Sequence, residues 1–168
     1  MSTTDAEEVV AAYWERAYRF AAMVTRNNQD SADVAQEAMI VVLRRLDQYD
    51  PEKGEFDSWL WRIVLNVARD AGRASVRRAS LFERLVSTHR ASVPADVEGF
   101  VVRRATDDQL LDAVRKLRPR LRTLIGLRFG AQLTYSEVAG HLGISEAAAV
   151  MATRRALAKL RSHLQEAQ

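Results

Sequence analysis

Cysteine is absent from the 168 residues of this chain, which excludes disulfides, thiolate metal ligands and a cysteine-based redox switch. Its histidines, His89, His141 and His163, are far apart, and none has a partner at the spacing of a metal site. No apolar run approaches the roughly 18 residues of a membrane span. The first eight residues are acidic and polar, unlike a secretory signal. We therefore expect a cytoplasmic protein with no metal, no cofactor and no membrane insertion.

Sequence signatures of catalysis are also missing. The chain contains no glycine-rich phosphate loop and no nucleophile elbow. The composition, 48% hydrophobic and 28% charged, is ordinary for a globular protein with real cores. We expect a protein that acts by binding and is not an enzyme.

Charge is unevenly distributed along the chain, although its net value is only +3. Residues 110–168 hold ten basic and four acidic side chains, whereas residues 1–79 hold eleven basic and thirteen acidic ones. An acidic front and a basic back predict two modules with different partners, and the basic one suits nucleic acid.

Apolar residues recur at helical spacing throughout, which predicts an all-α fold. Helices are expected at about 5–26, 31–46 and from Asp57 or Ser58 to Arg78. A further helix, capped by Asp107 or Asp108, should end at Arg118, and Pro119 should open the next. The helical spacing of apolar residues weakens between the third and fourth predicted helices. We therefore predict modules at 5–79 and 107–165 that are joined by a linker over 80–106.

The most specific pattern, from Leu133 to Arg161, is that of a helix-turn-helix. Thr134 and Glu137 have the spacing of a capping box, and Gly143 suits a tight turn. Ser145 can cap a second helix that carries the basic residues Arg154, Arg155, Lys159 and Arg161. A short helix, a turn and a longer basic helix is how a chain places a helix in the major groove of DNA.

A polar stripe on the third predicted helix is the second strong signal. At 100° per residue, one narrow face collects Arg62, Asn66, Arg69, Arg73 and Arg77, and the opposite face is apolar. Such a line of guanidinium groups can follow a phosphate backbone. A solvated arginine face without a ligand is the alternative.

Aromatic residues lie just before and within this helix. Phe56 and Trp59 fit a core, whereas Trp61 falls near the edge of the polar stripe, where it could stack on an unpaired base. The loop from Asp50 to Glu55 is a candidate for holding a base extruded from the duplex.

Acidic and amide side chains gather at the start of the second predicted helix: Asp30, Asp33, Gln36 and Glu37. They could simply complement the positive end of the helix dipole. The alternative is a polar docking surface for a basic partner protein.

Taken together, these segments resemble the extracytoplasmic-function, or group IV, sigma factors of bacterial RNA polymerase. Asp30 to Leu46, Asp50-Pro51 to Phe56, and Trp59-Leu60 to Arg73 are similar to sigma region 2, and Leu117 to Arg161 is similar to region 4. The resemblance covers nearly the whole chain apart from the linker.

The resemblance implies roles for residues of region 2. Asp33, Gln36 and Glu37 would dock on the β′ subunit of core RNA polymerase. The −10 element of promoter DNA would be bound by the loop and the third helix: Asp50, Lys53, Phe56, Trp61, Arg62, Asn66, Arg69, Arg73 and Arg77.

Region 4 would read the −35 element with its second helix and also bind the β subunit. The residues expected at the −35 DNA are Thr134, Ser145, Arg154, Arg155 and Lys159. Such a factor directs promoter recognition, melting and transcription initiation at a specific set of genes. It is expected to be a monomer when free and can be held by an anti-sigma factor.

One departure from the family pattern affects the second helix of the motif. Positions that usually carry Lys or Arg are Val150 and Ala152 here, although Arg155 is retained. Three explanations would each fit this departure. The helix could contact thymine methyl groups. It could read DNA shape through Arg154, Arg155 and backbone N–H groups, or it could have lost DNA contact and serve in protein docking. We adopt the second as a hypothesis, and it predicts a loosely specified −35 element.

Two other functions are compatible with the sequence. A free-standing helix-turn-helix regulator would bind duplex DNA alone, often as a dimer, but no dimerisation heptad is visible. A sigma-like interaction protein would instead sequester polymerase or a regulator, and the charge-poor recognition helix is its best support.

Overall fold

The computed structural model describes the backbone of residues 3–86 and 101–166 and the side chains of residues 5–81 and 108–166. Every secondary-structure element in this part of the chain is helical, which confirms the all-α class. Two helical modules are present, and both contribute to one hydrophobic core.

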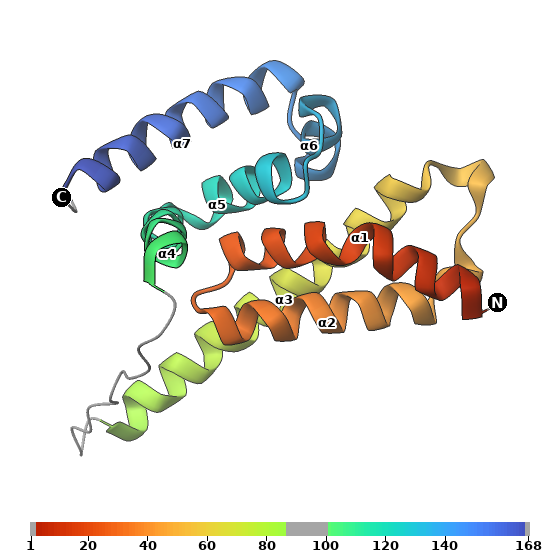
Figure 1. Ribbon diagram of the computed structural model, residues 1–168, viewed down its shortest axis with the longest axis horizontal. Helices are drawn as coiled ribbons and strands as arrows, with labels where there is room; N and C mark the ends of the chain where they lie inside the picture. The colour runs from red at the N-terminus through yellow and green to blue at the C-terminus, as the bar shows by residue number, and fades with distance from the viewer. Residues whose placement is uncertain (1–2, 87–100, 167–168) are drawn as a thin grey trace.

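The first module consists of three long helices and a short connecting loop (Figure 1). Helix α1 (Thr3–Val24) packs on α2 (Asn28–Arg44), whose other side contacts α3 (Phe56–Val86). The side chain of Asn27 begins α2 by accepting a hydrogen bond from the Asp30 N–H. Two 3₁₀ turns, η1 (Leu46–Gln48) and η2 (Pro51–Lys53), form the connection to α3.

The second module begins with α4 (Val101–Arg115) and α5 (Pro119–Ile125), and Pro119 opens α5 as predicted. Helix α5 continues into a π-helical turn, η3 (Gly126–Gly130). The helix-turn-helix follows as α6 (Tyr135–Leu142) and α7 (Glu146–Glu166). Helix α7 packs along α4, α5 and α6, and these contacts hold the motif in place.

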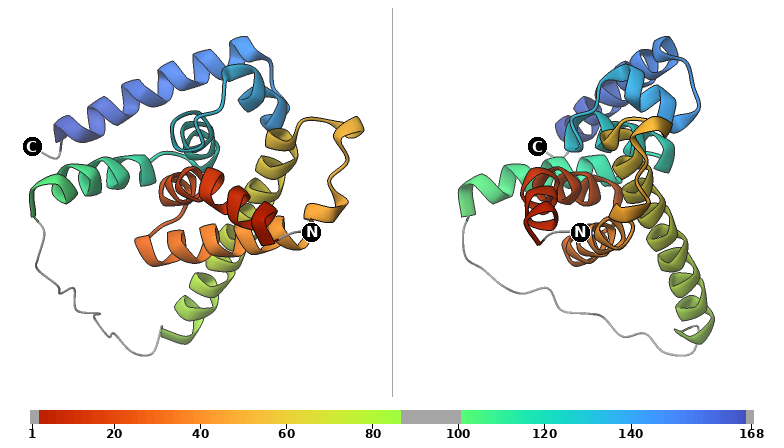
Figure 2. Two further views of the ribbon diagram at one scale, coloured as in Figure 1. Left: turned by 45° about the vertical axis from the view of Figure 1, so that its right-hand side comes forward. Right: turned by 90° about the vertical axis from the view of Figure 1, so that its right-hand side faces the viewer.

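The two modules are packed against each other, a question that the sequence leaves open. In Figure 1, α1 lies between α2 and α5. In both views of Figure 2 the second module again lies next to α1. Helix α1 contacts α4, α5 and η3. Phe20 and Trp61 from the first module and Leu127 and Leu133 from the second belong to one cluster of buried side chains.

Helix boundaries around the predicted linker differ from the sequence prediction. Helix α3 continues past Arg78 to Val86, and α4 runs from Val101 to Arg115. Asp107 and Asp108 therefore lie inside α4, and their predicted role as caps is wrong. Neither 79–86 nor 101–106 contains glycine or proline, so nothing in these stretches interrupts a helix. The centre of the linker, 87–100 with His89, lies outside the described residues.

Candidate nucleic-acid interface

The helix-turn-helix has the local geometry that its sequence predicts. The Thr134 hydroxyl accepts from the Glu137 N–H at 3.3 Å, and the Thr134 N–H donates to the Glu137 carboxylate at 2.7 Å, which confirms the capping box. The Thr134 hydroxyl also donates to the Glu137 carboxylate at 2.7 Å. This bond lowers the pKa of Glu137 below its usual value, and the bond from the Thr134 N–H lowers it further. Gly143 ends α6 with φ of 65°, a left-handed conformation that favours glycine.

Helix α7 begins at a Ser145 cap, whose hydroxyl accepts from the Ala148 N–H at 3.1 Å. In its first two turns Ala147, Ala148 and Met151 are exposed, whereas Val150 is half-buried. The exposed part of this half therefore carries no positive charge. The basic side chains Arg154, Arg155 and Lys159 are exposed further along the helix.

The polar stripe of α3 (Arg62, Asn66, Arg69, Arg73 and Arg77) is exposed along its whole length, as helical periodicity predicts. Arg73 forms an ion pair with Asp70 of the same helix, but both side chains are more than half exposed, so the pair contributes little. Guanidinium groups on successive turns form a row that follows the helix. This arrangement can neutralise neighbouring phosphates of one strand.

The loop before α3 is held by hydrogen bonds and aromatic contacts. Asp50 accepts from the Glu52 N–H at 3.0 Å and pairs with Lys53 at 3.1 Å, while the Tyr49 hydroxyl donates to the Gly54 carbonyl at 3.1 Å. The Phe56 ring lies 5.1 Å from Tyr49 and 5.5 Å from Trp59, measured between centroids. Phe56 is thus half-buried in an aromatic cluster that anchors the loop.

Trp61 is the one predicted site residue that the structure contradicts. Its side chain is fully buried, and its ring meets Phe20 edge-to-face at 5.9 Å. The Arg16 guanidinium carbon lies 5.3 Å from the centroid of the ring. A ring enclosed in this way cannot stack on a base. Trp61 lies near the edge of the apolar face of α3, and Phe20 and Arg16 of α1 lie against its ring there.

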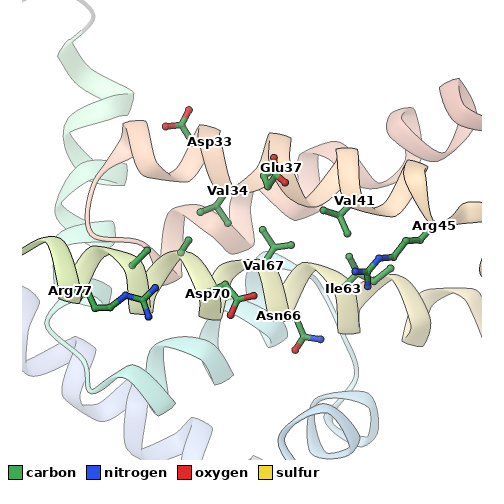
Figure 3. A pocket seen from close by; sticks show the side chains of 12 residues that line it. Asp33, Val34, Glu37, Val41, Arg45, Ile63, Asn66, Val67, Asp70 and Arg77 are labelled. Carbon is green, nitrogen blue, oxygen red and sulfur yellow. The ribbon is translucent and has the colours of Figure 1, made fainter.

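The acidic strip of α2 (Asp33, Gln36 and Glu37) is exposed, as a docking surface requires. Asp33 and Glu37 border a groove between α2 and α3 (Figure 3). Its floor is apolar, with Val34, Val41 and Val67 between the helices, and Asn66 and Arg77 of the polar stripe also line it. The strip and the stripe therefore share a groove, so a partner on α2 would lie next to anything bound along α3.

Helix α6 lies close to the polar stripe, because it contacts α3. Burial lowers the pKa of His141 below its usual value, and the positive charges of Arg62 and Arg69 lower it further, against the opposing effect of Glu137. His141 therefore stays neutral at physiological pH. Its position near two stripe residues brings the second module to the edge of the candidate DNA surface.

Arg16 was not expected to be important, yet it joins the two modules. Its Nε donates to the Ala131 carbonyl at 2.8 Å, and its guanidinium lies 3.4 Å from the Asp57 carboxylate. Tyr13, one turn earlier, donates to the same carboxylate, and burial raises the pKa of Tyr13 to about 12. A polar residue within the apolar face of a helix is the sequence signal that could have identified Arg16.

Two features are absent from the part of the chain that the structure describes. Among the described helices, none combines the length and apolarity needed to cross a membrane. The described His, Asp and Glu side chains form no group of three that could hold a metal ion.

Comparison with known families matches both modules. The family "Sigma-70 region 2" matches residues 4–78, and "Sigma-70, region 4" matches residues 113–162. The RNA polymerase sigma factor NccH of Alcaligenes xylosoxydans xylosoxydans is 32% identical over 142 residues, which cover 83% of this chain and 75% of NccH. The ECF RNA polymerase sigma factor SigE of Mycolicibacterium smegmatis is 29% identical over 161 residues, or 94% of this chain.

The relatives differ in length from this chain, which spans 61% of SigE and 51% of the Streptomyces coelicolor factor BldN. Two solved structures share the fold. CnrH, solved in complex with the cytosolic domain of CnrY, has a TM-score of 0.67 at 24% identity and covers 99% of this chain and 92% of that one. RpoE of Bartonella quintana, solved with the anti-sigma factor NepR, has a TM-score of 0.65 at 17% identity and covers 97% and 98%. The capped helix-turn-helix, the polar stripe and these relatives agree, and the chain belongs to the extracytoplasmic-function sigma factors of bacterial RNA polymerase.

Proposed function

We propose that this protein binds core RNA polymerase and directs it to promoters, where it supports melting and initiation. The observation that carries the proposal is that one chain presents an exposed acidic strip, an exposed polar stripe and a capped helix-turn-helix, in the order of sigma regions 2 and 4. The protein acts by binding, not by catalysis. Polymerase lies in the cytoplasm, and there we expect this protein to act.

Contact with polymerase is assigned to the acidic strip of region 2, taken as residues 5–79. Asp33, Gln36 and Glu37 are exposed on α2, and Asp33 and Glu37 border the groove with α3, where they can meet a basic surface of the β′ subunit. Region 4, taken as residues 107–165, would bind the β subunit. The two attachments would hold the factor on polymerase as a monomer.

The −10 element is assigned to the loop and the polar stripe. Asp50 and Lys53 lie on the loop, and Phe56 supports it from the aromatic cluster. Arg62, Asn66, Arg69, Arg73 and Arg77 provide a row of donors along α3, next to this loop. An opened strand could place one base at the loop and its phosphates along the row.

The −35 element is assigned to the start and middle of α7. Thr134 and Ser145 lie at the helix N-termini of the motif, where backbone N–H groups can meet phosphates. Arg154, Arg155 and Lys159 are exposed and can reach the DNA backbone. Because no exposed positive side chain precedes Arg154 in α7, we expect recognition of groove shape more than of individual bases.

An external inhibitor is the expected regulator. CnrH was solved with the cytosolic domain of CnrY, and the Bartonella RpoE was solved with NepR, an anti-sigma factor. This chain has no cysteine with which to sense redox state itself. We therefore expect a separate anti-sigma protein to control it.

The test is co-purification with core polymerase of the host, followed by run-off transcription from fragmented genomic DNA. Polymerase binding with new, sequence-specific start sites is the expected result. Charge reversal of the strip, with Asp33→Lys and Glu37→Lys, should abolish binding, whereas Glu15→Lys on α1 serves as a control. Failure of the wild-type protein to bind polymerase would refute the proposal and favour a free-standing DNA-binding regulator.

A second candidate function is favoured by the uncharged exposed surface of Ala147, Ala148 and Met151. A sigma-like protein could bind polymerase through α2 and use this surface for a protein partner. It would bind polymerase without producing new start sites, so the same experiment separates the two functions.

A further inference from the structure

A second cavity lies where α3 faces α5 and the turn between α1 and α2. It adjoins the groove of Figure 3 and shares lining residues on α2 and α3 with it. Its volume is about 820 Å³, and small-molecule sites measure roughly 300–1,000 Å³. We call it the arginine cavity, because its lining includes six arginines: Arg26, Arg69, Arg73, Arg77, Arg78 and Arg122.

Apolar side chains make up much of the remaining lining. Leu65 is buried, Val24 and Ala68 are half-buried, and Val76 is 55% exposed. Ligand sites in proteins are mostly apolar, and a few charged or polar groups fix the orientation of the ligand. Here those charged groups are mainly guanidinium groups, so the cavity suits an anion that also has an apolar part.

Positive charge is concentrated at the end of the cavity formed by α5. Arg122 is half-buried, its Nη1 donates to the Arg115 carbonyl at 3.2 Å, and its buried Nε has no hydrogen-bond partner. Burial lowers the pKa of Arg122, and the positive charges of Arg26 and Arg115 lower it further. Within the described residues, neither Arg26 nor Arg122 is paired with a carboxylate. An anion bound there would relieve this repulsion.

The α3 wall of the cavity also carries exposed arginines, among them Arg69 and Arg73. The acidic residues of the lining are Asp30 and Asp33, and both belong to α2. Asp30 accepts a hydrogen bond from the Asn27 side chain at 2.9 Å, within the cap of its own helix. The anionic part of a ligand is therefore expected between α3 and α5, where the lining contains arginine and no carboxylate.

Gly72 lies on the α3 wall of the cavity, inside a long helix. A Cβ atom added there would meet no other described atom within 4 Å, so packing does not require glycine. Backbone conformation does not require it either, because the described glycines with positive φ are Gly54 and Gly143. Glycine inside a helix lowers its stability relative to alanine. Glycine does, however, allow a ligand to approach the backbone closely.

We propose that the arginine cavity binds a nucleoside polyphosphate, with its phosphates at Arg26 and Arg122 and its base along the α3 wall beside Gly72. Phosphates match the donor geometry of guanidinium groups, and a planar base can lie on apolar side chains and stack on arginine. Because residues of α1, α2, α3 and α5 surround the cavity, a compact ligand fits it better than a nucleic-acid strand, which must enter and leave.

The test is calorimetric titration of the full chain with GTP and with ATP, and with guanosine and tripolyphosphate as the separate parts of the ligand. Gly72→Trp fills the cavity from a position where the added atoms first meet open space, and Gly72→Ala is its matched control. Arg26→Glu reverses a charge in the lining, whereas Arg120→Glu makes the same change on α5 outside the lining. Both arginines are exposed, so neither change disturbs the core.

We expect one nucleotide to bind per chain. Gly72→Trp and Arg26→Glu should each weaken binding by about tenfold or more, because one removes space and the other a charge-assisted contact. Gly72→Ala and Arg120→Glu should bind nearly as the wild type does. The inference is overturned if neither GTP nor ATP binds, if Gly72→Trp binds as tightly as Gly72→Ala, or if tripolyphosphate alone binds as tightly as the nucleotides.

Two further controls keep the outcome clear. If Gly72→Trp loses its cooperative unfolding, the pair Arg26→Glu and Arg120→Glu decides the question. A short single strand of thymidines that binds through Arg26, when the nucleotides do not bind, would assign the cavity to DNA and overturn the inference. All of these titrations use the protein without polymerase, so their result does not depend on the proposed function and cannot be confused with its failure.

Discussion

The candidate DNA-binding helices of the two modules, α3 and α7, differ in where they carry charge. In region 2, α3 carries four exposed arginines over Arg62 to Arg77 on a single face. In region 4, the exposed side of the first two turns of α7 holds Ala147, Ala148 and Met151, and the basic residues follow from Arg154. Helical periodicity places each set of residues on one side of its helix. Only the side of α3 that carries the arginines is suited to strong contact with phosphates along its length. If the proposed function holds, we expect α3 to make more contacts with phosphates than the first two turns of α7 do.

Neutralising the stripe is expected to have the largest effect. The triple variant Arg62→Ala, Arg69→Ala and Arg73→Ala should reduce run-off transcription by about tenfold or more, because each phosphate contact contributes about 0.9 to the salt slope of binding. The affinity of the reconstituted holoenzyme for a promoter is measured at several salt concentrations. The slope of the logarithm of the binding constant against the logarithm of the salt concentration should become shallower by roughly two to three units. Arg19→Ala on α1, an exposed arginine paired with Glu15, is the control. An unchanged slope would show that the stripe is only a solvated face.

Adding charge to α7 should make region 4 more like region 2. Ala148→Arg introduces a guanidinium on the exposed side near the Ser145 cap, without disturbing a buried residue. A bidentate contact with guanine contributes about 1–3 kcal/mol of discrimination, so we expect about a tenfold preference for guanine at one −35 position. Selection from a promoter library with a randomised −35 element measures this. Glu166→Arg, an exposed position at the C-terminal end of α7, is the matched control and should show no such preference.

Removing charge from α7 should have a smaller, sequence-independent effect. Arg155→Ala is expected to weaken holoenzyme binding by a few-fold on all −35 sequences and to lower the salt slope by about one unit, since it removes one phosphate contact. A sharply defined −35 motif whose recognition survives Arg155→Ala would contradict the hypothesis that region 4 reads groove shape.

The smallest effect is expected at the capping box of α6. Thr134→Ala should lower the free energy of unfolding by about 1 kcal/mol at pH 7, because the cap hydrogen bond is lost. The Glu137 pKa is lowered in the folded protein, so its contribution is present above the usual pKa of Glu and is lost as the pH falls through that of the folded state. Urea unfolding at pH 7 and at pH 4 should therefore show a smaller difference between variant and wild type at the lower pH. An equal difference at both would show that Glu137 is not coupled to the cap.

Much of the candidate site could be predicted from the sequence because it depends on neighbours along the chain. The capping box at Thr134 and the left-handed turn at Gly143 are set by residues within a few positions, and the structure confirms both. The exposure of the stripe from Arg62 to Arg77 follows from helical periodicity. The predicted ends of helices were less accurate. The third helix was predicted to end at Arg78 but continues to Val86, because no glycine or proline follows Arg78 to end it.

Predictions failed where distant segments meet. Trp61 lies at the edge of the apolar face of α3, and it is buried beside Phe20 and Arg16 of α1. Arg16 stands out in the sequence as a polar residue on an apolar helix face, but its partner Ala131, far away along the chain, is known only from the structure. Local periodicity contains no information about which surface of another module covers a helix edge.

The sequence by itself determined the all-α class, the helix-turn-helix, the acidic strip of α2 and the polar stripe of α3, because hydrogen bonding, capping and periodicity act over a few residues. Only the tertiary structure decided that the modules pack together, that Trp61 is enclosed and that Gly126 and Gly130 touch α1. Those outcomes depend on the complementary shapes of surfaces brought together from distant parts of the chain, and shape complementarity is a property of the folded backbone.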